Sequence, residues 1–213
     1  MDYWTHRDAL DNKEVPASLT IVGGGVIGME FASFFTSLGV QVTVVEMLDE
    51  ILGGMDKELS AMLRAEYAKK GIKFLLSTKV VGVSKGETGI TVSYENADGA
   101  GTVTADKLLM SVGRRPVTKG FGLENLNLEW TERRCIKVDE HLQSSVPGVY
   151  VCGDLNGVSL LAHTAVREAE VAVHHIIGKE DAMSYRAIPG VVYTNPEIAG
   201  VGMSEEALQA AGI

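Results

Sequence analysis

A glycine-rich segment follows the first long apolar run of the chain. Gly23, Gly25 and Gly28 have the spacing G-x-G-x-x-G and come directly after Leu19–Val22. In such a segment the first glycine permits a tight turn, the second lets a pyrophosphate approach the backbone, and the third lets a helix lie close to the strand. The first turn of that helix offers free N–H groups and the positive end of its dipole to the phosphates. The pattern alone is weak, but its place between a strand and a helix favours a dinucleotide-binding site.

A carboxylate occupies the end of the next predicted strand. Glu46 follows Gly23 by 23 residues, close to the separation of about 20 at which an acidic residue binds the ribose hydroxyls of a dinucleotide. It would repel a 2′-phosphate, and residues 47–49 include no arginine to attract one. We therefore expect NAD(H) rather than NADP(H). Glu30 lies two residues after Gly28, and the residues alone leave open whether it serves the ligand or only the helix dipole.

The elements that must hold these residues alternate between strands and helices. Apolar runs and i, i+3, i+4 patterns predict the order strand, helix, strand, helix, strand, which implies parallel strands joined by right-handed crossovers. Three short strands separated by turn residues then predict an inserted antiparallel meander. The predicted fold class is therefore α/β, a Rossmann-like domain with an antiparallel β-meander. The expected elements are 19–22, 26–38, 41–46, 56–70 and 72–76, then 79–83, 90–94 and 101–105 in the meander, and finally 107–112.

A second region begins near Val117. Strands are expected over 136–138 and 149–152, and small residues at helical spacing predict a helix over 160–177. A strand in VVYT and a capped helix after Ser204 follow. At the other end, the polar residues 1–16 contain a capped helical turn that begins at Thr5. The histidines without a catalytic context, which we expect at the surface, are His6, His141, His174 and His175.

Composition excludes several classes of function. The 213 residues carry a net charge of −9, which argues against a general nucleic-acid binder. The two cysteines, Cys135 and Cys152, exclude a disulfide scaffold and a thiolate zinc cage, and no metal site is expected. The stretch Leu19–Val45 has one charged residue, Glu30, but a strand–turn–helix–strand unit explains it without placing that charge in lipid. With no signal peptide before it, we expect a cytoplasmic protein that does not span a membrane.

Five motifs, taken together, match a known family. The segments VGGGVIGME, VTVVE, SVGRRP, GVYVCGD and LLAHTA occur here in the order found in the flavin-dependent pyridine nucleotide-disulfide oxidoreductases. Within that family the chain resembles the dihydrolipoamide dehydrogenases most strongly. Family members carry an FAD domain interrupted by an NAD domain and followed by a dimerisation domain. The resemblance implies a linker from the FAD domain over 1–16, the NAD domain over 17–117, the C-terminal part of the FAD domain over 118–187, and the start of the dimerisation domain over 188–213.

The resemblance also assigns site residues. Val80 matches a position that packs on the adenine, and Gly113 matches a backbone contact near the nicotinamide. Asp154 matches the acid that holds the ribityl chain of FAD, and Leu160–His163 match the segment beside the flavin pyrimidine edge. Glu30 matches a carboxylate that borders the flavin and the nicotinamide. The full cofactor-binding set is Gly23, Gly24, Gly25, Val26, Ile27, Gly28, Met29, Glu30, Glu46, Val80, Gly113, Asp154, Leu160, Leu161, Ala162 and His163.

Parts that the family needs for catalysis are missing from these residues. Cys135 and Cys152 are too far apart in sequence to match the redox pair beside the flavin, and Cys152 is interpreted as a core residue. The family's first G-x-G-x-x-G, which binds FAD, and its C-terminal His-Glu pair are also absent. We therefore expect a fragment without catalytic residues of its own, which does not retain FAD and does not oxidise dihydrolipoamide alone.

The resemblance implies a role for the parent enzyme. It would be a homodimer that passes electrons from a dihydrolipoyl dithiol, through a cysteine pair and FAD, to NAD. Its partner would be the lipoyl-carrying component of a 2-oxoacid dehydrogenase or of the glycine-cleavage system. Two alternatives stay open: another NAD-linked member of the family, such as a transhydrogenase or mercuric reductase, and a nucleotide-binding module without catalysis.

Overall fold

The computed structural model describes residues 3–213, which divide into two compact units. Unit 1 contains the residues up to Gly113 together with Val191–Ile213, and unit 2 contains Arg114–Gly190. The chain therefore leaves unit 1 once and returns to it. The assignment of these segments to NAD, FAD and dimerisation domains remains a prediction.

A four-stranded parallel sheet forms the centre of unit 1, with the order β3-β2-β1-β7. The last residue of β1, Val22, lies opposite the last residues of both neighbours, Val45 and Met110. The carboxyl ends of these three strands therefore meet at one edge, which is where ligands bind in open α/β sheets. The strands are β1 (Ser18–Val22), β2 (Gln41–Val45), β3 (Lys73–Leu75) and β7 (Lys107–Met110).

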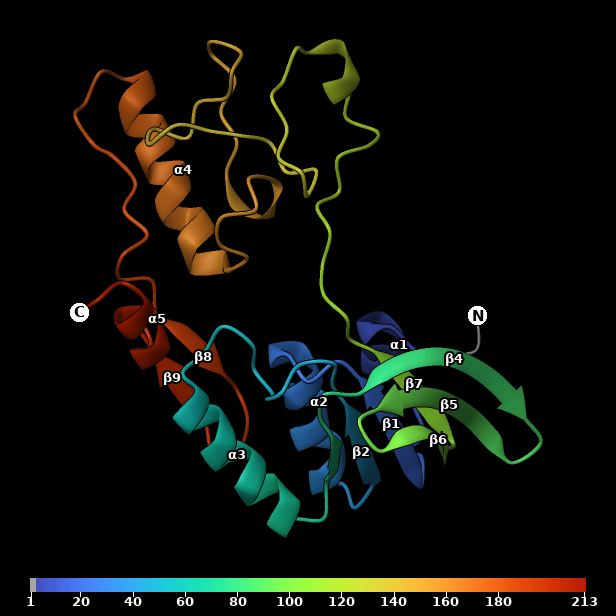
Figure 1. Ribbon diagram of the computed structural model, residues 1–213. Helices are drawn as coiled ribbons and strands as arrows, with labels where there is room; N and C mark the ends of the chain where they lie inside the picture. The colour runs from blue at the N-terminus through green and yellow to red at the C-terminus, as the bar shows by residue number, and fades with distance from the viewer. Residues whose placement is uncertain (1–2) are drawn as a thin grey trace. The chain divides into compact units, whose positions relative to one another are not determined.

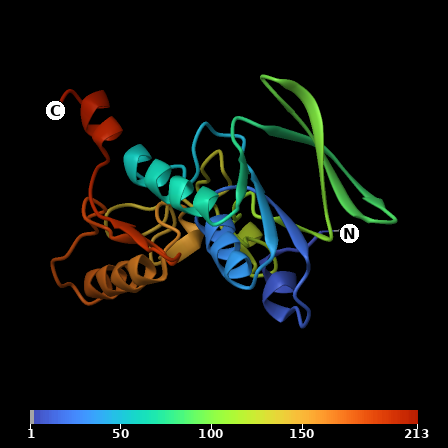
Figure 2. The same ribbon diagram turned by 90° about the horizontal axis from the view of Figure 1, so that it is seen from below.

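Each face of this sheet is covered by a different kind of structure. Ile21 points into a cluster of helix residues that includes Met29 and Leu63, whereas its neighbour Val22 packs with Val92 of the meander. This alternation follows from the period of two along a strand. Figures 1 and 2 show the helices on one side of β1 and β2 and the meander on the other. The helices are α1 (His6–Asp11), α2 (Val26–Ser37) and α3 (Lys57–Lys69); the antiparallel meander is β4 (Lys79–Gly86), β5 (Gly89–Asn96) and β6 (Gly99–Ala105). The α/β prediction with an inserted meander is confirmed.

Both terminal segments of the described chain pack on unit 1. Trp4 pairs through its backbone with Leu108 and Met110, and the Asp8 carboxylate caps α1 by accepting from the Thr5 N–H. The returning segment forms a two-stranded sheet and a short helix: β8 (Gly190–Val192), β9 (Ile198–Gly200) and α5 (Glu205–Ala210). The sequence analysis did not find β9, because three residues are too few to show a strand pattern.

A buried tyrosine fixes the returning segment to the helices of unit 1. Tyr67 on α3 is 1% exposed, and its hydroxyl donates to Ser33 Oγ over 2.6 Å. The same hydroxyl accepts from the backbone N–H of Asn195 over 2.9 Å. One side chain thus joins α2, α3 and the residues after β8.

Unit 2 has one long helix and little regular strand structure. The helix α4 (Ala162–Ile176) begins two residues later than predicted, because Leu161 is extended as its N-cap. The prediction of strands over 136–138 and 149–152 was wrong. These segments form only isolated β-bridges and no continuous strand pairing. Arg134, in the turn before 136–138, and Leu142, in the turn after it, have left-handed conformations, and these tight reversals leave no room for longer pairing. Two short 3-10 turns complete the unit, Leu123–Asn125 and Gly153–Leu155.

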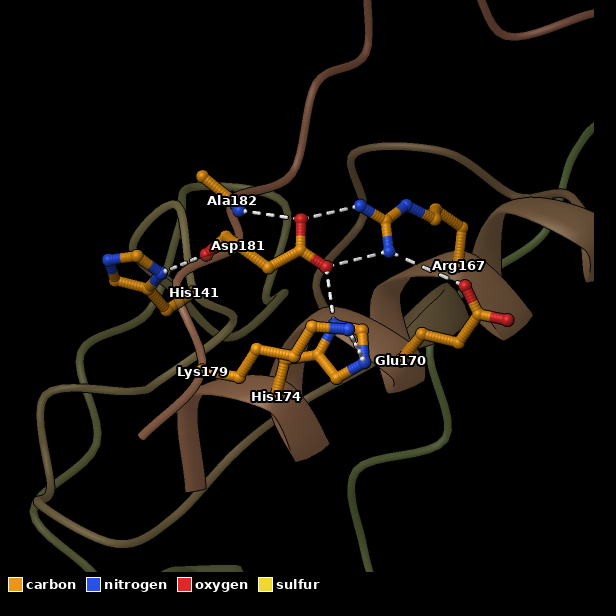
Figure 3. A network of polar contacts seen from close by, with 7 residues as sticks. All are labelled: His141, Arg167, Glu170, His174, Lys179, Asp181 and Ala182. Atoms are coloured by element: carbon orange, nitrogen blue, oxygen red, sulfur yellow. Dashed lines mark hydrogen bonds and ion pairs between the residues drawn. The ribbon is translucent and has the colours of Figure 1, made fainter. Parts of the chain in front are cut away.

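A polar network joins α4 to the loop that follows it (Figure 3). The Asp181 carboxylate accepts two hydrogen bonds from Arg167, at 2.9 and 2.6 Å, and one from His174 Nδ1 at 2.7 Å. His141 Nδ1 lies 2.8 Å from the Asp181 carbonyl oxygen. His141, His174 and their neighbour His175 are half-buried, as is His6 on α1, which corrects the expectation that all four lie on the open surface.

This network predicts a loss of stability in acid. The hydrogen bonds from Arg167 and then His174 hold the pKa of Asp181 well below its ordinary value of 3.8. A lowered carboxylate pKa stabilises the fold above the ordinary value, and that contribution disappears as pH falls below it. We expect Asp181→Asn to be less stable than the wild type near neutral pH, with a difference that shrinks from about pH 5 downward. Fluorescence of Trp130, the tryptophan of unit 2, would report urea unfolding across that range; a difference independent of pH would contradict the assignment.

Candidate functional site

The glycine loop lies in a narrow space between the ends of β1 and β7. Gly23 has a φ of +103°, and a Cβ added there would lie 2.3 Å from the Ser111 carbonyl oxygen. Only glycine fits such a position without moving the backbone of the neighbouring strand. The turn therefore places the chain between β1 and its neighbours, at the point where the strand order reverses.

The other two glycines of the motif have opposite surroundings. A Cβ on Gly28 would lie 2.0 Å from the carbonyl oxygen of Gly23, so the missing side chain lets α2 lie directly against the loop. A Cβ on Gly25, the N-cap of α2, would meet no atom within 4 Å. The loop is thus closed on the side of Gly28 and open at Gly25. An open backbone at a helix N-terminus fits a pyrophosphate, which needs close approach to N–H groups.

Glu46 is held against this loop by two backbone hydrogen bonds. Its Oε2 accepts from the Gly24 N–H over 2.6 Å, and its Oε1 accepts from the Leu48 N–H over 2.8 Å. Each carboxylate oxygen has a second lone pair, so both can still accept from hydroxyl groups. The structure therefore brings Glu46 and the glycine loop together, with the charge fixed in position rather than free in solvent.

The remaining predicted residues of unit 1 lie in different environments. Met29 is fully buried in the core, so its side chain faces the sheet rather than the solvent. Glu30 is half-buried, and its Oε1 accepts from the Tyr193 N–H over 3.0 Å. Val80 packs partly buried with the meander cluster, and Gly113 is exposed with a φ of +109°. On α2, Val26 is exposed and Ile27 is half-buried.

The predicted flavin residues of unit 2 lie around one cavity and the helix beside it. Asp154 and Leu160 line a cavity of about 810 Å³. Leu161 is the N-cap of α4, and the exposed Ala162 and His163 lie in its first turn. The cavity is within the size range of small-molecule and cofactor sites. His163 Nε2 lies 2.9 Å from the Pro189 carbonyl oxygen, which suits a structural role better than that of a base.

A buried carboxylate beside this site was missed by the sequence analysis. Glu168 on α4 is fully buried, and it accepts from the Gly153 N–H and, over 2.7 Å, from the Tyr185 hydroxyl. Burial and then Glu168 raise the pKa of Tyr185, so that the phenol stays a donor. Helical spacing could have indicated its burial, because Glu168 lies four residues after Thr164 and three before Val171, on the buried face of the helix.

Removing this carboxylate should destabilise unit 2. Glu168→Ala leaves the buried Gly153 N–H and the half-buried Tyr185 hydroxyl without their acceptor and empties a fully buried position; an unsatisfied buried donor alone costs about 1–3 kcal/mol. We expect a total loss of at least about 2 kcal/mol in urea unfolding followed by Trp130 fluorescence. Glu170→Ala on the same helix is the control, because its exposed ion pair with Arg167 contributes about 0–1 kcal/mol. Equal losses in the two variants would contradict this role of Glu168.

The cysteines have no features of a redox centre. Both are free thiols, and Cys135 is buried. Burial, and secondarily Glu168, raise the pKa of Cys152, which disfavours the reactive thiolate. Among residues 3–213 no group of three or more His, Cys, Asp or Glu side chains is placed to hold a metal ion. No helix in that same part of the chain is long and apolar enough to cross a membrane.

Comparison with known proteins gives consistent matches. Residues 1–169 match the family described as pyridine nucleotide-disulphide oxidoreductase. The chain is 41% identical to dihydrolipoyl dehydrogenase of Thermus scotoductus, over 99% of its own length and 46% of that protein. It is 42% identical to the mitochondrial dihydrolipoyl dehydrogenase of Homo sapiens, over 96% of its length and 41% of that protein. The chain thus spans less than half the length of these curated relatives.

Solved structures show the same relationship. LpdA of Mycobacterium tuberculosis superimposes with a TM-score of 0.89 at 31% identity, over 98% of this chain and 45% of that one. The HOCl-induced flavoprotein disulfide reductase RclA of Escherichia coli gives a TM-score of 0.88 at 28% identity, over 99% and 48% of the two chains. Together with the family match over most of its residues, these likenesses show that the chain belongs to the pyridine nucleotide-disulphide oxidoreductase family.

Proposed function

We propose that this chain binds NAD(H) at the glycine loop and supplies part of the FAD site of a dihydrolipoyl dehydrogenase. The observation that carries the proposal is the Glu46 carboxylate, fixed by the Gly24 N–H beside an open helix N-terminus. The names of the relatives at about 40% identity supply the dihydrolipoyl substrate. The chain covers under half of those proteins, so we propose the dihydrolipoyl dehydrogenase reaction for the full-length enzyme and not for this chain alone.

The residues of unit 1 have separate tasks in this proposal. The N–H groups around Gly25 bind the pyrophosphate, and the dipole of α2 adds favourable potential. Glu46 accepts hydrogen bonds from the two adenosine ribose hydroxyls and repels the 2′-phosphate of NADP(H). Val80 contacts the adenine and Gly113 contacts the nicotinamide end. When bound, NAD supplies the hydride acceptor and FAD supplies the two-electron relay from the dithiol.

The residues of unit 2 serve the flavin in this proposal. Asp154 accepts hydrogen bonds from the ribityl hydroxyls, and Leu160–His163 present the N-terminus of α4 to the pyrimidine edge. The positive end of that helix stabilises negative charge there. Glu30 borders the path between flavin and nicotinamide, with its carboxylate oriented by the Tyr193 N–H. The partner of the full enzyme would be a lipoyl-carrying component, and its active form a homodimer.

The chain should bind cofactor without completing the reaction. Its two cysteines are not a redox pair, since Cys135 and Cys152 are both free thiols and burial raises the pKa of Cys152. We expect no NADH to form when the purified chain is mixed with dihydrolipoamide and NAD. Sustained NADH formation, followed by absorbance, would contradict this part of the proposal.

The deciding experiment is a parallel calorimetric titration of the purified chain with NADH and NADPH. Binding of NADH with little or no binding of NADPH supports an autonomous NAD site selected by Glu46. Equal binding of both nucleotides rejects the selectivity, and binding of neither rejects the site as formed by this chain. Absorbance near 450 nm, measured on the same sample, tests whether any FAD is retained; we expect a colourless protein.

A further inference from the structure

The loop between Glu46 and α3 supports the glycine loop from the interior of unit 1. Leu52 donates its backbone N–H to the Gly24 carbonyl oxygen over 2.9 Å. The Ile51 side chain lies against the same glycine, since its Cγ2 would be 3.1 Å from a Cβ added to Gly24. Ile51 and Leu52 are each 1% exposed and belong to the core of unit 1. Residues 47–52, the support loop, therefore connect the core to the glycine loop.

The hydrogen bond from Leu52 also sets the direction of a neighbouring donor. Both backbone groups of Gly24 are occupied, because its N–H donates to Glu46 Oε2 and its carbonyl oxygen accepts from Leu52. The peptide bond from Gly24 to Gly25 is trans, and in a trans peptide the C=O and the N–H point in opposite directions. The Gly25 N–H therefore points away from the support loop. That N–H is one of the donors that the proposed function assigns to the pyrophosphate.

Leu52 occupies a backbone conformation that needs support from its surroundings. Its φ is +54°, in the left-handed region, which costs a leucine more than a glycine. Conformations of this kind persist only where the surrounding structure enforces them. On the C-terminal side, the Leu52 carbonyl oxygen accepts from the Met55 N–H over 3.0 Å, which closes a turn. On the N-terminal side the support comes from Glu50.

An ion pair with α3 holds Glu50 in place. The Glu50 side chain is only 12% exposed, and its Oε1 accepts from the Ile51 N–H over 2.9 Å. Arg64 donates from Nε to both Glu50 oxygens, over 2.8 and 3.0 Å. By contrast, the ion pair of Lys69 with Glu66 on the same helix joins side chains that are 70% and 48% exposed. Exposed pairs contribute little, whereas a shielded carboxylate that also binds the backbone holds its segment in one position.

We propose that Arg64 and Glu50 are positioning residues for nucleotide binding. Arg64 orients the Glu50 carboxylate, and Glu50 holds the backbone of the support loop. Leu52 then directs the Gly25 N–H toward the phosphates. Neither charged side chain needs to touch the nucleotide, because a loop already held in its bound conformation loses less freedom on binding. The inference rests on the proposed NAD(H) site and adds two residues that lie outside the glycine motif.

The first experiment needs no nucleotide. Amide hydrogen exchange of Leu52, followed by NMR, is compared in the wild type, Arg64→Gln and the control Lys69→Gln. We expect the Leu52 amide to exchange at least about tenfold faster in Arg64→Gln, because the support loop opens more often, and at the wild-type rate in the control. The Val44 amide, in the centre of the sheet, should exchange equally in all three proteins. An unchanged Leu52 rate in Arg64→Gln would overturn the proposal.

The second experiment measures NADH binding by calorimetry. Arg64→Gln and Glu50→Gln should each bind NADH at least about threefold more weakly, and Lys69→Gln should bind like the wild type. Arg64→Lys should recover most of the affinity, because an ammonium group can still donate to Glu50. Wild-type affinity in Arg64→Gln would contradict the positioning role.

The double variant Arg64→Gln/Glu50→Gln distinguishes positioning from direct contact. It should bind NADH no more weakly than Glu50→Gln alone, because Arg64 acts through Glu50. Losses that add would show that Arg64 contacts the nucleotide itself, which overturns the proposal. If the wild type binds no NADH, the proposed function is rejected, and the Leu52 exchange rate alone then decides whether the ion pair holds the support loop.

Discussion

Replacement of Glu46 by alanine is expected to weaken NADH binding by at least about tenfold, because a charge-assisted hydrogen bond contributes about 1.5–3 kcal/mol. The carboxylate also holds the glycine loop, since its Oε2 accepts from the Gly24 N–H over 2.6 Å. The alanine variant therefore loses the ribose contact and also frees the loop that surrounds the pyrophosphate. Both losses act in the same direction.

A second substitution separates these two effects. Glu46→Gln keeps an oxygen acceptor for one of the backbone N–H groups but removes the negative charge. We expect NADH to bind with intermediate affinity and the discrimination against NADPH to fall, since the 2′-phosphate is no longer repelled. Glu58→Ala, an exposed carboxylate on α3, is the control and should leave both affinities unchanged. If the alanine variant binds NADH as the wild type does, Glu46 is not part of the site.

Unit 1 could be predicted from the sequence because its signals are local. The apolar run before Gly23, the glycine spacing and the β-branched strand that ends at Glu46 each predict one element and its neighbour in space. Parallel pairing then follows from the alternation of strands and helices. What the pattern does not contain is the hydrogen bond from Gly24 to Glu46, because it joins residues from two different strand ends.

Unit 2 was harder to predict because its structure depends on contacts distant in sequence. The segments 136–138 and 149–152 have the composition of strands, but the turns at Arg134 and Leu142 limit them to single bridges. A left-handed conformation at arginine or leucine has no sequence signal, since glycine is the usual residue there. The cavity of unit 2 is lined by the segments 114–119 and 132–135 as well as by Asp154 and Leu160, and only the fold brings these parts together.

Gly28→Ala should mainly lower the stability of the fold, whereas Gly25→Ala should mainly weaken NADH binding, although both add a single methyl group to the same loop. The Gly28 methyl would lie 2.0 Å from the Gly23 carbonyl oxygen, and neither backbone segment can move away without separating α2 from β1. Alanine is intrinsically better than glycine inside a helix by about 1 kcal/mol. Overpacking against backbone exceeds that gain, so we expect a net loss of stability of about 2 kcal/mol or failure to fold.

The Gly25 methyl would meet nothing within 4 Å, and the backbone there, with a φ of −70°, accepts any residue. We expect Gly25→Ala to fold with a loss of stability of about 1 kcal/mol, since alanine is a poorer N-cap than glycine. Its methyl nevertheless occupies the space through which a pyrophosphate must approach the N–H groups of α2, so NADH should bind at least about tenfold more weakly.

Urea unfolding and NADH calorimetry on both variants measure the two effects independently. A Gly25→Ala protein that binds NADH normally would show that the open side of the loop is not where the phosphates lie, whereas a stable Gly28→Ala protein would show that α2 does not need its close contact with β1.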